Sequence, residues 1–411
     1  MTIASMTGRA PRFTALPPLS LYVHLPWCVR KCPYCDFNSH EARGEVPEGA
    51  YVDTLLADLE SALPQVWGRR VGTVFIGGGT PSLFSAAAID RLLAGIRARL
   101  PLRADAEVTL EANPGTFERE KFAGFFAAGV NRLSLGIQSF DPRHLAALGR
   151  IHDADEARRA VEAAMMIFGN VNLDLMFALP SQTLDECEAD VAAALSFRTP
   201  HLSFYQLTLE PNTLFHRDPP PLPDDDLAAD MQDHVQARLG SAGYRRYEVS
   251  AYAQAGRECA HNLNYWRFGD YLGIGAGAHG KISLPDRIVR EVRWKQPRQY
   301  MDNVAAGKPW LERREVTRGE VGFEFMLNAL RLTDGVPSAL FTERSGFPLA
   351  IVAHALEEGV RQGLLDADPS RIAATALGRR FLNRTIALFL PDGGATDAVT
   401  SAPIVFSEPH A

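Results

Sequence analysis

The chain has 411 residues, of which 46% are hydrophobic and 22% charged, the composition of a globular protein with a sizeable core. Its formal net charge is −7, so it lacks the basic surface that non-specific nucleic-acid binding requires, and we expect no nucleic-acid partner. No apolar run is long enough to cross a bilayer, and the first residues lack the apolar core of a signal peptide. We therefore expect a cytoplasmic protein.

In the first half of the chain, extended apolar segments alternate with helical patterns such as 51–63, 85–100 and 184–197. About six βα units of this kind predict a parallel sheet, which right-handed crossovers can curl into a barrel or part of one. The predicted strands are 21–26, 71–78, 107–113, 132–139, 171–180 and 201–210.

After about residue 280 the pattern changes, because amphipathic helical segments dominate at 319–332, 349–365 and 376–390. This predicts a small, mostly helical C-terminal domain. The last residues are rich in Gly, Ala and Ser, which is typical of disorder. The predicted division is a disordered arm (1–19), a barrel domain (20–285), a helical C-terminal domain (286–391) and a disordered tail (392–411).

Three of the five cysteines, Cys28, Cys32 and Cys35, lie within eight residues directly after the first predicted strand. Their clustering and the odd total indicate a metal site rather than a disulfide framework. Three thiolates on one short loop can cap three corners of a cubane cluster and leave the fourth iron open. Zinc, with His24 or His40 as fourth ligand, is the alternative, although structural zinc sites usually draw their ligands from two separated pairs.

The segment CVRKCPYC after the first strand resembles the cluster loop of the radical S-adenosylmethionine (SAM) superfamily. The resemblance implies an α/β fold with an incomplete (βα)6 TIM-like barrel, a [4Fe–4S] cluster on Cys28, Cys32 and Cys35, and SAM bound to the open iron. Over most of residues 20–390 the chain resembles oxygen-independent coproporphyrinogen III oxidase and its relatives. The motifs that carry this resemblance are LYVHLPWC, FIGGGTPS, LEANPGT, LSLGIQSF, LGRIHD and DLMFALPSQT.

The same resemblance implies SAM contacts at the strand ends. Glycines let the backbone approach a ligand closely, although a simple strand–helix turn would also use them. A carboxylate such as Glu111 can accept hydrogen bonds from ribose or amine groups, or lie solvated on the rim. Asp174, inside an apolar segment, needs a partner. The implied contacts are Tyr22, Gly78, Gly79, Thr80 and Glu111 for one SAM, and Gln138, Arg150 and Asp174 for a second.

Two features differ from the oxidase: Phe37 stands where the oxidase loop has a further cysteine, and the first strand lacks the longer preceding arm. The segment HNLNYW resembles the His-Asn-x-x-Tyr-Trp haem signature of HemW-type haem chaperones. This resemblance implies haem contacts from His261, Asn262, Tyr265 and Trp266, with imidazole as an iron ligand and aromatic rings against the macrocycle. Arginines nearby in the sequence are candidates for pairing haem propionates: Arg245, Arg246, Arg257 and Arg267.

The sequence therefore favours a haem chaperone that carries a [4Fe–4S] cluster and exchangeable SAM, binds haem and transfers it to an acceptor protein. A respiratory enzyme is one expected acceptor, which would bring peripheral contact with a membrane-bound partner. The alternative function is oxygen-independent coproporphyrinogen III oxidation in porphyrin biosynthesis. A zinc-stabilised binding protein without iron is a third hypothesis. No catalytic residue is assigned.

Overall fold

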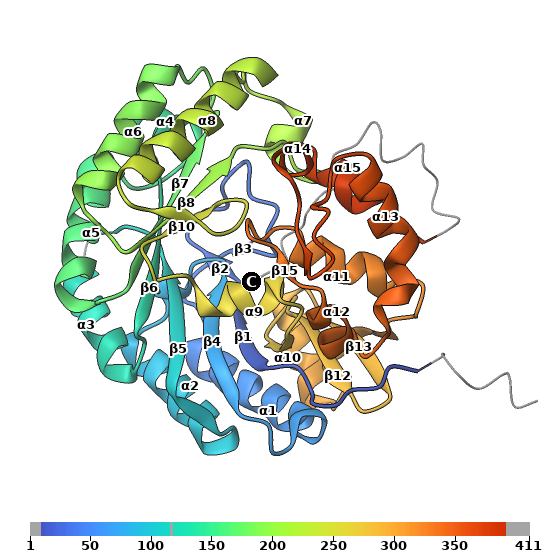
Figure 1. The fold of residues 1–411 in the computed structure, drawn as a ribbon. Coiled ribbons are helices and arrows are strands. Elements are labelled where there is room, and N and C mark those ends of the chain that lie inside the picture. Colours follow the sequence, from blue (N-terminus) through green and yellow to red (C-terminus); the bar gives the residue numbers. More distant parts are fainter. Residues whose placement is uncertain (1–9, 116–117, 392–411) are drawn as a thin grey trace, which may run out of the picture.

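A computed structural model of the protein describes residues 10–115 and 118–391. One large mixed sheet curves through the centre, with helices around its outside (Figure 1). The strand order is β14-β13-β12-β11-β1-β4-β5-β6-β7-β8-β10-β9, and the two edge strands do not pair with each other. The predicted incomplete barrel is therefore confirmed. Residues 1–9 of the predicted arm and all of the predicted tail lie outside the described residues.

All six predicted strands form, and they pair in parallel in chain order. The first strand, LSLYVHL, is buried at every position, as expected for a parallel strand covered on both faces. A seventh parallel strand, which the sequence analysis did not identify, pairs with the other side of the first. These strands are β1 (Leu19–Leu25), β4 (Val71–Gly78), β5 (Leu102–Ala112), β6 (Arg132–Gln138), β7 (Val171–Phe177), β8 (His201–Gln206) and β11 (Asp270–Ile274).

Helices that connect the parallel strands cover the outer face of the sheet (Figure 1). Two of them begin at capping boxes, one formed by Asp153 and Glu156 and the other by Thr183 and Glu186, which satisfy amide groups that the first turn leaves free. The outer helices are α1 (Glu48–Val66), α2 (Ala86–Arg99), α3 (Glu118–Ala128), α4 (Pro142–Ala147), α5 (Ala154–Ile167), α6 (Leu184–Ser196) and α8 (Asp225–Ser241). A 3-10 turn at Pro81–Leu83 follows β4, and the short α7 (Leu214–Arg217) lies against the loop after β1, where the Phe215 amide donates to the Pro33 carbonyl at 3.0 Å.

Antiparallel strands extend the sheet at both edges. A fully buried ion pair between Asp58 of α1 and Arg293, 3.1 Å long, ties this extension to the outer helices. Residues 287–293 and 310–315, which the sequence analysis assigned to the helical domain, thus continue the barrel sheet. The added elements are β9 (Arg245–Arg246), β10 (Ala251–Ala253), α9 (Ala260–Trp266), β12 (His279–Leu284), β13 (Arg287–Arg293), α10 (Pro297–Ala305) and β14 (Trp310–Glu315).

The last part of the chain is mainly helical and lies beside β12 and β13 (Figure 1). Its apolar cluster includes Phe325 and Phe341, and Trp266 of α9 and Phe13 pack on it. No helix in the described ranges is long and apolar enough to cross a membrane. The remaining elements are α11 (Val321–Ala329), β15 (Val336–Pro337), α12 (Ala339–Ser345), a 3-10 turn (Leu349–Val352), α13 (Ala353–Arg361), β16 (Arg371–Ile372), α14 (Ala376–Arg380) and α15 (Leu382–Ala387).

Candidate functional site

The three clustered cysteines lie on the loop between β1 and α1, at the carboxyl end of the barrel strands. Two short strands, β2 (Trp27–Cys28) and β3 (His40–Glu41), pair within this loop. The side-chain amide of Asn38 donates to the carbonyl oxygens of Ala276 and Lys295, at 2.8 and 2.9 Å, and so anchors the loop to the segments after β11 and β13. The loop is therefore held in place by the barrel.

The donor set fits an iron–sulfur cluster. Cys28, Cys32 and Cys35 are free thiols and half-buried. Burial raises the pKa of Cys35 to about 11, so a bound metal has to drive its deprotonation. A guanidinium nitrogen of Arg150 lies 3.6 Å from the Cys32 sulfur, and such a cation favours anionic sulfur ligands.

A zinc site with a histidine as fourth ligand fits the structure less well. The His24 ring nitrogens are within hydrogen-bond distance of the Tyr22 hydroxyl at 2.8 Å and of the Asn38 carbonyl at 2.9 Å. His40 Nε2 lies 3.2 Å from the Lys295 carbonyl oxygen. Each imidazole predicted as a zinc ligand is thus engaged elsewhere.

The glycine-rich turn that follows β4 lies beside the cluster loop. Gly78 has a φ of 120°, and a Cβ there would come within 2.7 Å of the His24 ring. Only glycine meets both constraints without displacing its neighbours. The Gly78 amide donates to a Glu111 carboxylate oxygen at 3.1 Å, and the Asn113 side chain donates to the Thr80 hydroxyl at 2.9 Å. The turn and the end of β5 therefore form one polar wall.

The three residues predicted for a second SAM also lie close together. Gln138 ends β6 with a φ of 69°, unusual for a residue other than glycine. Arg150 donates to the Gly136 carbonyl at 2.7 Å. Asp174 accepts hydrogen bonds from Ser134 and Asn172, both at 2.8 Å, and burial raises its pKa in spite of them.

These groups share one cavity of about 710 Å³ inside the barrel. Alternate residues of β6, β7 and β8 face it along the whole length of each strand, as the two-residue period of a strand requires. Of the predicted site residues, those that line the cavity are Cys28, Cys32, Cys35, Gly78, Gly79, Thr80, Glu111, Gln138, Arg150, Asp174, Asn262, Tyr265 and Trp266. The cavity thus joins the cysteine loop to the HNLNYW segment.

Tyr22 and His261, also predicted as ligand contacts, are fully buried and lie outside the lining. Tyr22 stacks behind Phe75, with ring centroids 6.3 Å apart, and it is Phe75 that faces the cavity. Direct contact of Tyr22 with SAM stays a prediction. In the structure Tyr22 supports the wall of the cavity.

The HNLNYW segment forms α9, which closes the amino end of the barrel. His261 Nδ1 is 2.7 Å from the Thr73 hydroxyl, and His261 Nε2 is 2.9 Å from the Tyr265 hydroxyl. Burial lowers the pKa of His261 to about 3, so the ring is neutral. The side chain of Asn264 donates to the Ser20 hydroxyl at 2.8 Å. Because both His261 nitrogens are engaged, iron ligation by His261 requires one of these hydrogen bonds to open.

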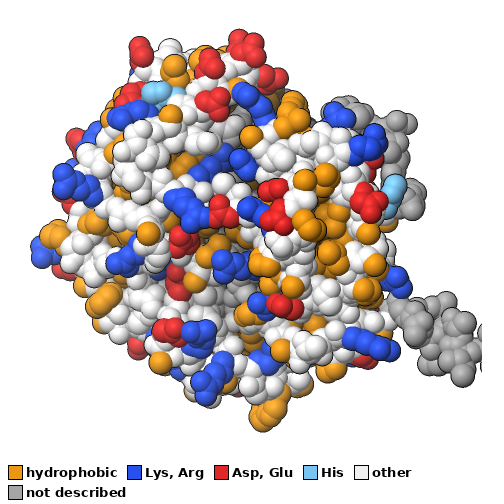
Figure 2. Space-filling model, in the orientation of Figure 1, with side chains coloured by type: hydrophobic (Ala, Val, Ile, Leu, Met, Phe, Trp, Pro, Cys, Tyr) orange, Lys and Arg blue, Asp and Glu red, His pale blue; other side chains and the backbone are white. Residues whose placement is uncertain are grey.

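The arginines chosen for their closeness in sequence do not line the cavity. Arg245 is exposed and pairs with Asp334, and Arg246 donates to the Val249 carbonyl at 2.7 Å. The cations that line the cavity come from distant parts of the chain. Figure 2 shows Lys and Arg side chains near the centre of one face of the molecule. The cavity-lining cations are Arg30, Lys121, Arg132, Arg150 and Arg331.

Sequence reasoning did not assign Arg132 or Arg331 to the site. The sequence does contain a signal for Arg132. It is the first residue of the apolar strand RLSLGIQ, and an arginine in such a strand is rarely buried without a partner. Arg331 has no such signal, because it follows α11 in a different domain and reaches the cavity only through folding.

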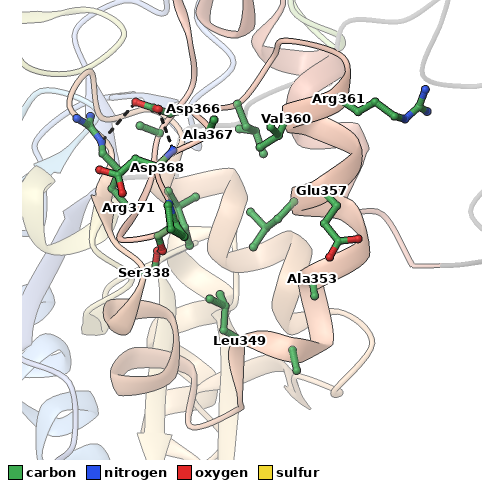
Figure 3. A pocket seen from close by; sticks show the side chains of 16 residues that line it. Ser338, Leu349, Ala353, Glu357, Val360, Arg361, Asp366, Ala367, Asp368 and Arg371 are labelled. Carbon is green, nitrogen blue, oxygen red and sulfur yellow. Dashed lines mark hydrogen bonds and ion pairs between the residues drawn. The ribbon is translucent and has the colours of Figure 1, made fainter.

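A second cavity, of about 600 Å³, lies in the C-terminal domain (Figure 3). Apolar side chains of the 3-10 turn, α13 and the following segment line most of it, including Leu349, Leu356 and Val360. Asp366 and Arg371 form an ion pair of 3.8 Å at its edge. None of the site residues predicted from the sequence lines this second cavity, so the barrel cavity is the candidate functional site.

Comparison with known proteins agrees with the fold. Residues 22–194 match the radical SAM superfamily, and residues 316–381 match the HemN C-terminal domain. The coproporphyrinogen III oxidase HemN of Escherichia coli, a radical SAM enzyme, has a similar fold, with a TM-score of 0.78, 24% identity, and coverage of 91% of this chain and 90% of that one. The fold and the cysteine loop thus define a radical SAM protein.

Relatives with higher sequence identity show to which family of radical SAM proteins the chain belongs. The chain is 50% identical to the heme chaperone HemW of Escherichia coli (strain K12) over 379 residues, which cover 92% of this chain and 99% of that protein. It is 46% identical to the heme chaperone HemW of Haemophilus influenzae over 383 residues, with the same coverage. The chain therefore belongs to the HemW family, and the resemblance identified from its motifs is confirmed.

Proposed function

We propose that this protein binds haem in the barrel cavity and transfers it to an acceptor protein. A [4Fe–4S] cluster on Cys28, Cys32 and Cys35 and an exchangeable SAM would occupy the other end of the same cavity. The observation that carries the proposal is that the cysteine loop and the α9 residues Asn262, Tyr265 and Trp266 line a single cavity. The close HemW relatives support it.

The chain's own residues suit these ligands. Gly78 and Gly79 line the cavity with backbone groups alone, which SAM could contact directly, and Glu111 offers a carboxylate acceptor at the same wall. When bound, the cluster supplies one-electron reduction of SAM, while the protein orients the groups.

At the α9 end, aromatic and cationic groups combine. Trp266 lies in the wall, and the Arg331 guanidinium carbon is 4.2 Å from its ring centroid. A porphyrin has a flat apolar face and two carboxylates, so it matches a wall of this kind. The acceptor in this proposal is a haem-requiring protein such as a respiratory enzyme.

The alternative function, coproporphyrinogen III oxidation, is supported by one observation. The cysteine loop, the glycine turn and Glu111 form a continuous wall at the carboxyl end of the barrel, which is the arrangement that SAM cleavage would need. The exchange of a cysteine for Phe37 and the high identity to HemW proteins favour the chaperone function instead.

One sample can decide between these functions. The anaerobically reconstituted full-length protein is titrated with haem and followed by Soret absorbance, and then assayed for coproporphyrinogen III consumption. We expect saturable haem binding, transfer of the haem to an apo-haem protein, and no consumption. Turnover at an enzyme-like rate would instead establish the oxidase function.

A matched pair of variants tests the location of the haem. Trp266→Ala should weaken haem binding by about tenfold, or about 1.4 kcal/mol, with unchanged cluster content. Trp67→Ala is the control, since Trp67 is 83% exposed and lies outside the cavity. Equal haem affinity of Trp266→Ala and wild type would place the haem elsewhere.

A further inference from the structure

Arg132 is a buried cation at the inner end of the barrel cavity. It is the first residue of β6, its exposed fraction is only 2%, and its side chain lines the cavity. Within the described ranges, its Nε has no hydrogen-bond partner, and the guanidinium makes no ion pair with a carboxylate. A buried charge without a counter-ion is costly, so its presence points to an anionic ligand.

The nearest carboxylates are engaged with other groups. Glu107 accepts hydrogen bonds from the backbone amides of Ala260 and His261, at 3.2 and 3.0 Å, at the start of α9. Asp174 accepts from Ser134 and Asn172. Both carboxylates act on the Arg132 charge electrostatically from a distance, but neither forms an ion pair with it among the described residues.

Further polar side chains line the cavity near Arg132. Asn172 and His201 face the same part of the cavity, and His201 is hydrogen-bonded to both Asn172 and Tyr247, at 2.6 and 2.9 Å. His201 and Asn172 are thus hydrogen-bonded to other groups, and among the described residues no hydrogen bond joins either of them to the Arg132 guanidinium. Arg331, by contrast, donates to Glu248 at 3.1 Å and is already compensated.

We propose that Arg132 binds a carboxylate of the ligand that occupies the α9 end of the cavity. The inference rests on the proposed function, under which this carboxylate is a haem propionate. Guanidinium and carboxylate can form two parallel hydrogen bonds, so Arg132 would fix the orientation of the porphyrin as well as contribute affinity. The other available carboxylate is that of SAM. The contacts predicted for the first SAM lie at the opposite, cluster end, whereas Asp174, predicted for a second SAM, lies nearer to Arg132, so SAM affinity has to be measured as well.

The experiment compares haem with its dimethyl ester, which lacks both propionate charges. Full-length, anaerobically reconstituted protein is titrated with each compound and followed by Soret absorbance, and SAM affinity is measured by calorimetry. For wild type we expect haem to bind at least tenfold more tightly than the ester. Arg132→Gln should abolish this preference, Arg132→Lys should restore part of it, and SAM affinity should stay unchanged.

Arg245→Gln is the matched control, because Arg245 is exposed, lies outside the cavity, and was the sequence-based candidate for the same role. It should retain the wild-type preference for haem. The wild-type comparison needs no variant, so the inference can be tested even if Arg132→Gln does not fold.

The outcomes separate the two proposals. If wild type binds haem and its ester equally, or if Arg132→Gln keeps the preference for haem, the role of Arg132 is refuted while haem binding stands. If Arg132→Gln loses SAM affinity but not the haem preference, the carboxylate belongs to SAM, and the assignment is again wrong. If wild type binds no haem, the proposed function itself fails.

Discussion

Replacement of His261 by alanine should destabilise the fold, whatever it does to haem binding. The hydrogen bonds around the ring define one consistent network. The Thr73 hydroxyl donates to Ser20, so it accepts from His261 Nδ1–H, and His261 Nε2 then accepts from the Tyr265 hydroxyl. Because Ser20 also accepts from the Asn264 amide, the network ties α9 to β1 and β4.

The expected loss can be estimated from these contacts. Two hydrogen bonds disappear, each contributing about 1 kcal/mol. The fully buried ring also leaves a cavity beside Phe75, whose centroid is 5.1 Å away, and this adds about 1–2 kcal/mol. We therefore expect His261→Ala to lower the free energy of unfolding by about 3–4 kcal/mol.

Urea unfolding of the cluster-free protein, followed by tryptophan fluorescence, measures this change. Asn262→Ala is the control, since Asn262 lies on the same helix, is half-buried, and should cost less than about 0.5 kcal/mol. If His261→Ala were as stable as wild type, the hydrogen-bond network would be refuted. Nε2 of His261 in the wild-type protein would then be free to bind iron.

The same network gives a test of iron ligation by His261. If Nε2 is the axial donor, haem binding has to break the hydrogen bond to Tyr265. Tyr265→Phe removes that competing bond, so it should then bind haem at least as tightly as wild type and keep its Soret spectrum. Weaker haem binding by Tyr265→Phe would argue that the Tyr265 hydroxyl, held by His261, is the group the ligand needs.

Three further predictions concern other parts of the barrel. Cys28→Ser should lose the broad absorption near 400 nm (roughly where such clusters absorb) after reconstitution, whereas Cys187→Ser should keep it; a complete cluster in the first variant would refute the ligand assignment. Gly78→Ala should weaken SAM binding about tenfold in calorimetry, because the added methyl group collides with His24; unchanged affinity would mean that the turn does not contact SAM. Burial raises the pKa of Asp190 to about 6 in the folded chain, so the folded state holds its proton more tightly than the unfolded state. The free energy of unfolding should therefore fall by about 2–3 kcal/mol as the pH rises from about 4 to about 6. Urea unfolding of Asp190→Asn should not show this fall. A pH profile of Asp190→Asn identical to that of wild type would contradict the prediction.

Much of the fold could be predicted from the sequence, because the strands and helices follow from the apolar and polar pattern of neighbouring residues. The apolar segment 21–26 became β1 at Leu19–Leu25, and 132–139 became β6 at Arg132–Gln138. The cysteine spacing and the glycine turn also depend on neighbouring residues only. The strand β11 was missed because its residues follow α9 directly and pair with β1, some 250 residues away in the chain, which no local pattern reveals.

The position of each side chain in the candidate site was decided by tertiary structure. Arg245 and Arg246 are close to the HNLNYW segment in sequence, but they point away from the cavity, while Arg132 reaches it from β6. His261 stands within the signature, yet Thr73 and Tyr265 occupy both of its nitrogens. Motif and spacing determine which chemical groups the chain carries. Burial and hydrogen-bond partners depend on which strands become neighbours, and that is decided only when the strands assemble into the curved sheet around the cavity.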